Sequence, residues 1–147
     1  MDLIKICRVM MEEGYYPHLE QNHIQFNIDD DPATLEYEDG IMSVRIFFSI
    51  DEDSYETFLE AGNAAMSGST GIKPVILGER KILMFSSENM CDTVREFRKF
   101  LPRSIAMIRD AVAVHRHEMR RLLEKSMLYK NLYSHEDEYD TTNKFCS

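Results

Sequence analysis

The longest regular pattern in this chain is a helical one that runs from Arg103 to about Tyr133. Every third or fourth position falls on one stripe, as on one face of an α-helix. The stripe comprises Ile105, Ile108, Val112, His115, Met119, Leu122, Ser126, Tyr129 and Tyr133. Such a helix spans roughly 46 Å, whereas a strand of six residues spans only about 20 Å. The helix must therefore be longer than any sheet that it covers.

The residues before this helix predict a shorter helix followed by an antiparallel β-meander. Residues 2–13 carry apolar side chains at helical spacing, and Gly14 is a natural stop. Alternating apolar residues predict strands at 23–28, 33–38 and 41–50, with a short edge strand within 15–20. Asp39-Gly40 is typical of a hairpin turn, and the Asp-Asp-Asp-Pro stretch at 29–32 is interpreted as a longer one.

The middle of the chain predicts a second helix and two short strands. Asp53, with Glu56 three residues later, forms a capping box for a helix that reaches about Met66. Strands follow at 73–77 and 81–86. The expected fold class is therefore α+β: a helix, an antiparallel β-meander, a helix, two strands and a long C-terminal helix.

Asp92 or Thr93 is expected to cap a helix that precedes Arg103, and Glu96 completes a second capping box from Thr93. Pro102 is expected either to kink this helix or to start a new one, because proline fits only the first turn without cost. We expect a single domain over residues 1–133. The acidic, polar tail of residues 134–147 is expected to fray.

Charge is unevenly distributed along the chain, whose net charge is −9. Residues 1–92 sum to −12, residues 93–134 to +6 and residues 135–147 to −3. The acidic balance argues against a general nucleic-acid binder. The basic stretch has two possible partners, the acidic body of the same chain or an acidic partner, and we favour the first because it is the nearer.

The lack of a recognisable targeting signal and the pattern of cysteines favour a cytoplasmic protein. No apolar run approaches the roughly 18 residues of a membrane span, and the N-terminus lacks the basic start and continuous apolar stretch of a signal peptide. Cys7, Cys91 and Cys146 are odd in number and widely spaced. We expect free thiols in a reducing compartment.

His115 and His117 do not form a metal site on a helix. Residues two apart point about 200° apart around the axis, so the two imidazoles cannot share an ion. His115 lies on the apolar stripe, where we expect a buried or interfacial histidine. At an interface it would make association sensitive to pH.

Two further patterns that suggest a ligand also fail on spacing. The acidic stretches 29–31 and 51–53 lack the central glycine of a calcium loop. The segment 68–74 resembles a phosphate loop, but it leads from a helix into a strand, and Pro74 follows the lysine. We expect no metal, no cofactor and no catalytic constellation.

The long helix supplies the candidate binding surface. Residues from Ile105 to Val112 are expected to pack on the domain's own sheet, and beyond about His115 the helix is expected to outrun that sheet. A second copy of the chain is the commonest partner for a self-complementary stripe, so we expect a homodimer. The candidate interface residues are Ile108, Val112, His115, Met119, Leu122, Leu123 and Met127.

The order of elements, together with several short segments, resembles the YbjN-like bacterial family, whose fold is similar to that of type III secretion chaperones. The segments that carry the resemblance are 13–15, 24–26, 41–50, 58–63 and 73–75, and it covers about residues 1–125. It implies a non-enzymatic protein-binding or chaperone-like role, often as a dimer that holds a protein or peptide client. The longer terminal helix and the acidic tail depart from the family. The competing hypothesis is an enzyme or small-ligand sensor with a pocket between sheet and helices, near His115.

Overall fold

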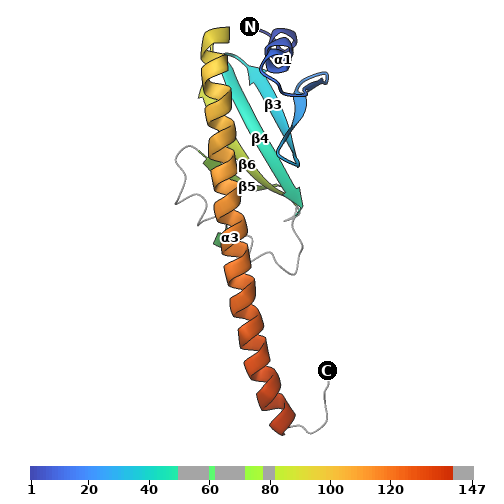
Figure 1. The fold of residues 1–147 in the computed structure, drawn as a ribbon, viewed down its shortest axis with the longest axis vertical. Helices are drawn as coiled ribbons and strands as arrows, with labels where there is room; N and C mark the ends of the chain where they lie inside the picture. Colours follow the sequence, from blue (N-terminus) through green and yellow to red (C-terminus); the bar gives the residue numbers. More distant parts are fainter. Residues whose placement is uncertain (50–59, 62–71, 78–81, 141–147) are drawn as a thin grey trace.

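The computed structural model describes residues 1–49, 60–61, 72–77 and 82–140, which form an α+β fold (Figure 1). Its elements are α1 (Leu3–Glu12), β1 (His18–Leu19), β2 (Ile24–Ile28), β3 (Asp31–Glu38), β4 (Ile41–Ser49), β5 (Ile72–Leu77), β6 (Ile82–Met90) and α3 (Val94–Asp140). The predicted helix at 53–66 lies outside the described residues, apart from Glu60 and Ala61, which are helical. The fold class and the order of the other elements are as predicted.

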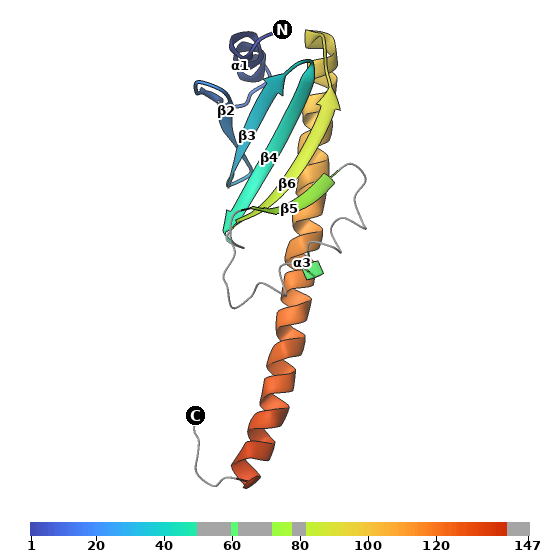
Figure 2. The same ribbon diagram turned by 180° about the vertical axis from the view of Figure 1, so that it is seen from behind.

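The strands form one antiparallel sheet in the order β1-β2-β3-β4-β6-β5. Apolar side chains alternate along β2, where Ile24, Phe26 and Ile28 are buried and the residues between them are exposed. The buried face packs against α1 and α3, whose inward residues join the same core. Figure 2 shows the opposite face of the sheet, with α3 behind it.

Two tight hairpins set the register of the first strands. Asp39 and Gly40 have φ angles of 52° and 77°. Both are positive, as the two central positions of a type I′ turn require. The β2–β3 turn is shorter than the sequence suggested, since Pro32 already pairs with Asn27. Proline fits there because that edge of β3 extends beyond the pairing with β4, which begins at Ala33.

Gly40 is fixed by its backbone and by its neighbours. A Cβ at this position would lie 2.7 Å from Oδ1 of Asp92, and its φ is strained for any L side chain. We expect Gly40→Ala to lower the free energy of unfolding by about 1–3 kcal/mol, measured by urea denaturation. The matched control is Gly14→Ala, where φ is also positive but an added Cβ meets nothing within 4 Å. Equal losses in the two variants would contradict the proposed steric role of Asp92.

Strand β6 is longer than predicted, since it continues past Ser86 to Met90. The predicted strand ends at Ser86, where the sequence becomes polar. In the structure Ser87 donates a hydrogen bond to the buried Ser104 of α3 at 3.2 Å, and Asn89 donates one to the same hydroxyl at 2.8 Å. These bonds satisfy polar groups between sheet and helix, so the strand can continue beneath α3.

Helix α3 is a single continuous element through Pro102. The capping box is as predicted, with Glu96 N donating to Thr93 Oγ1 at 3.1 Å. Phe97, Leu101 and Ile105 are all buried around the proline, and their packing holds the helix on the sheet. The helix ends at Asp140 and not near Tyr133. At 47 residues it spans about 70 Å, against about 30 Å for the nine residues of β4.

Candidate protein-interaction surface

The first half of α3 is bound to the body by ion pairs. Arg98 pairs with Glu12 and Glu13 at the end of α1. Arg109 and Arg116 lie seven residues apart on the same face of the helix. Arg109 pairs with Asp29 at 3.1 Å and Arg116 with Asp31 at 2.9 Å. The basic stretch therefore neutralises the acidic body of the same chain up to Arg116, as predicted. These partly exposed pairs fix the position of α3 more than they stabilise the fold.

Three of the predicted interface residues are part of the domain's own core. Ile108, Val112 and His115 are 0%, 6% and 5% exposed. The sheet covers the helix as far as His115, so these side chains are not accessible to a partner. Their prediction as interface residues was wrong, because helical periodicity does not show which part of the apolar stripe the domain's own sheet covers.

His115 is the last buried residue of α3 within the part of its length for which side chains are described. Its ring meets the edge of Phe85 with centroids 5.5 Å apart, and Phe85 meets Phe48 in the same way at 6.2 Å. A buried histidine was expected at this position. Among the described residues, no three His, Cys, Asp or Glu side chains are grouped so that they could hold a metal ion.

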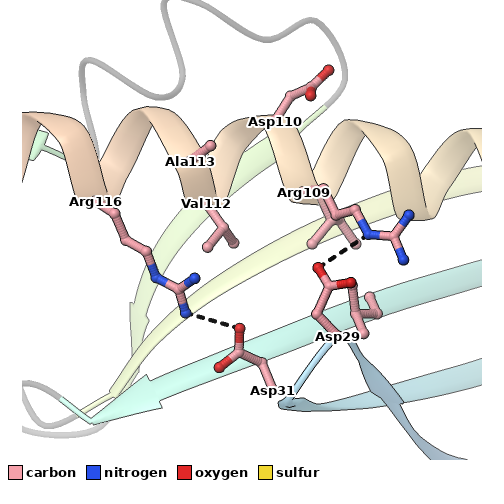
Figure 3. Close-up of a pocket in the computed structure, with 9 residues that line it drawn as sticks. Asp29, Asp31, Arg109, Asp110, Val112, Ala113 and Arg116 are labelled. Atoms are coloured by element: carbon pink, nitrogen blue, oxygen red, sulfur yellow. Dashed lines mark hydrogen bonds and ion pairs between the residues drawn. The ribbon is translucent and has the colours of Figure 1, made fainter.

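Two adjoining cavities lie beside α3 at this level. One of about 320 Å³ lies between the β2–β3 turn and the helix, and is bracketed by the Arg109–Asp29 and Arg116–Asp31 pairs (Figure 3). The other, of about 280 Å³, lies between Phe48, His115 and Met119 and shares Arg116 with the first. Arg116 also lies over the Phe48 ring at 5.8 Å. Each arginine already has an aspartate partner, so a charged ligand in the first cavity would meet two neutralised ion pairs.

Beyond Met119 the helix continues away from the sheet (Figure 1). We refer to residues 119–140 of α3 as the projecting segment. Met119 and Leu122 are half-buried, whereas Leu123 is 43%, Met127 63% and Leu128 65% exposed. The prediction that the helix outruns its sheet past His115 is thus confirmed. Of the seven predicted interface residues, the last four lie in this segment.

The individual ion pairs at the β2–β3 turn were not predicted from the sequence. A signal was present, since Arg109 and Arg116 are seven residues apart and so lie on one face of a helix. Asp29 and Asp31 are both placed at a turn that the hydrophobic pattern already implied. What the sequence could not show is that this turn lies against that part of the helix.

The fold is similar to that of solved structures, whereas the sequence matches no family profile. No protein-family profile matches the chain, and no curated protein matches its sequence. YbjN from E. coli, provisionally assigned as a transcription regulator, superposes with a TM-score of 0.67 at 12% identity, over 82% of this chain and 94% of that one. An uncharacterized protein from Methanothermobacter thermautotrophicus superposes with a TM-score of 0.54 at 13% identity, over 83% and 96%. The predicted YbjN-like fold is confirmed, and at these identities the likeness extends to the fold alone.

No helix in the described part of the chain combines the length and apolar character needed to cross a membrane.

Proposed function

We propose that this chain, which has the YbjN-like fold, is a non-enzymatic protein-binding module of the cytoplasm that acts as a homodimer through its projecting segment. One observation carries the proposal: Leu123 and Met127, four residues apart on one face, are exposed on a helix that has left its own sheet. Exposed apolar side chains gathered on one element are typical of interaction surfaces.

The physics of isolated helices supports a partner for this segment. Most helical stability in proteins comes from packing an apolar face, and the projecting segment has no sheet of its own to pack against. Met119, Leu122 and Leu123 form such a face where the helix leaves the sheet. Packing against a second helix would remove that face from water and stabilise the segment at the same time.

The face of the sheet opposite α3 is the proposed surface for a protein or peptide client. On this face Arg45 pairs with Glu36 of β3 at 2.8 Å and lies 3.7 Å from Glu88 of β6. The three charges leave one acidic group in excess, and Arg45 points away from the core because its neighbours Val44 and Ile46 point into it. Such a surface of mixed charge suits a polar protein segment better than a nucleic acid, whose phosphates the acidic balance would repel.

Ending the chain after Leu123 tests the proposal. Every buried side chain described for α3 lies at or before His115, so the shortened chain is expected to keep its core and its urea midpoint. It is expected to sediment as a monomer at a concentration where the intact chain is a dimer, because Met127 and the rest of the projecting segment have been removed. A shortened chain that dimerises as tightly as the intact one would refute the role of the projecting segment.

The cavities beside Arg116 support a second candidate, a small-ligand sensor. A ligand there would need an apolar body over Ile108 and Val112 and charged groups able to replace the ion pairs. Because the polar groups already satisfy one another, the exposed helix surface is the better-supported site.

A further inference from the structure

Two apolar side chains are exposed on the face of the sheet opposite α3, close to the β3–β4 hairpin. Ile41 begins β4 and Met90 ends β6, and the two residues are partners across these strands. Ile41 is 42% exposed and Met90 is 77% exposed. Both point away from α3, because neighbouring residues of a strand point to opposite faces. The neighbour Met42 is buried in the core, and the neighbour Asn89 donates a hydrogen bond to α3.

Three glutamates lie around this apolar pair on the same face. Glu38 is the partner of Ile41 across the hairpin, and Glu36 and Glu88 lie two residues farther along β3 and β6. All three side chains are accessible to solvent. Strands β2, β3, β4 and β6, which the structure describes throughout, contain one lysine or arginine, Arg45. Since Arg45 balances one carboxylate, two negative charges remain beside the apolar pair.

Further carboxylates lie at this end of the sheet. The pKa of Tyr37 is raised above its ordinary value, first by burial and then by the carboxylate of Asp92. Burial also raises the pKa of the Cys91 thiol, and the carboxylates of Glu96 and Asp92 raise it further. A cationic group that approaches this end of the sheet is therefore attracted.

We propose that the surface made by Ile41, Met90, Glu36, Glu38 and Glu88 binds an extended segment of a client protein whose basic and apolar side chains alternate along one face. This inference rests on the proposed client-binding role of the sheet and specifies the chemistry of the client. Two residues of an extended chain span about 6.8 Å, which is also the step from Met90 to Glu88 along β6. A basic residue two positions from an apolar one thus reaches a glutamate while the apolar side chain covers Ile41 and Met90. The flexible thioether of Met90 adapts to apolar side chains of different shape.

Synthetic peptides test the chemistry of the client directly. A fluorescein-labelled peptide with the repeating sequence Lys-Ser-Leu-Ser presents lysine and leucine alternately on one face of an extended chain. It is expected to bind the intact chain saturably in a fluorescence anisotropy titration. Replacing its lysines with glutamate, or its leucines with serine, is expected to raise Kd by at least about tenfold. Equal affinity for any two of the three peptides would overturn the proposed chemistry.

Charge reversal tests the same site on the protein. The variant Glu38→Lys/Glu88→Lys is expected to bind the basic peptide at least about tenfold more weakly. Glu36 is left unchanged because it holds an ion pair within the sheet. The matched control is Asp30→Lys/Asp110→Lys, which changes the net charge equally at two exposed positions, one in the β2–β3 turn and one on α3. It is expected to alter Kd by less than about threefold, because charges farther than a Debye length are screened.

The two variants separate a defined site from general attraction to an acidic protein. Circular dichroism confirms that each variant is folded. Equal weakening of peptide binding in both variants would overturn the proposed site, since net charge alone would then account for binding.

The chain that ends after Leu123 separates the client surface from the homodimer. It is expected to bind the basic peptide with the same Kd as the intact chain, because the proposed surface lies on the sheet. Tighter binding by the shortened chain would show that the projecting segment of a second copy occupies this surface, and weaker binding would place the client on that segment. Either result would overturn the inference, whereas sedimentation without peptide tests the homodimer independently.

Discussion

Replacing both Leu123 and Met127 with glutamate is expected to raise the dimer Kd by at least about 100-fold. Full burial of a leucine or methionine side chain contributes about 1.5–3 kcal/mol, and every 1.4 kcal/mol corresponds to about tenfold in Kd. Each substitution also occurs in both protomers and adds a charge to the interface. Sedimentation equilibrium would measure the effect, with the urea midpoint of the core expected to stay unchanged because both side chains are exposed in the single chain.

Leu128→Glu provides the matched control. Leu128 is as exposed as Met127, yet it lies nine residues after Met119 and so points about 180° away from it around the helix. In a two-helix interface centred on the Met119 face, this change is expected to alter Kd by less than about threefold. If Leu128→Glu dissociated the dimer while the double variant did not, the interface would be on the opposite face of the helix.

Phe85→Ala is expected to have the largest effect on the stability of the fold. Phe85 is fully buried on the face of β6 that packs against α3, with its ring against both Phe48 and His115. Removing a buried phenylalanine ring typically costs about 3–5 kcal/mol, since packing cannot close the cavity. Urea denaturation would measure the loss.

Phe48→Ala is the control for this prediction. Phe48 is half-buried and borders the smaller cavity, so it loses less contact on truncation and is expected to cost about half as much as Phe85→Ala. A loss from Phe85→Ala no greater than that from Phe48→Ala would show that the core beneath α3 is not centred on Phe85.

Local features of the fold were predictable because their causes are local. The type I′ turn at Asp39-Gly40 and the capping box at Thr93 depend on residues next to them in the sequence. The end of β6 was not predictable, because Ser87 and Asn89 are satisfied by Ser104 of a different element. A polar segment that is paired across the core has the same composition as a loop.

The candidate surface was predictable only in part, for a related reason. Helical periodicity identifies an apolar stripe but not what covers each portion of it. Ile108, Val112 and His115 share the stripe with Met119 and Leu122, and only the position of the sheet separates the first group from the second. The length of the helix relative to the sheet predicted a boundary near His115, whereas the residue types alone did not show which part of the helix is exposed.

The fold itself gives little information about partners. Likeness to YbjN at 12% identity establishes a shared architecture, and function depends on the surfaces that each chain carries on it. In this chain the surface that needs an explanation is the projecting segment, with its exposed apolar residues.

The mass of the intact chain in solution tests this account most directly. Sedimentation equilibrium at micromolar concentration is predicted to give twice the 17.2 kDa of one chain, with dissociation on dilution. A mass of 17.2 kDa that stays constant up to the highest concentration measured would contradict the proposed homodimer and, with it, the role of the projecting segment.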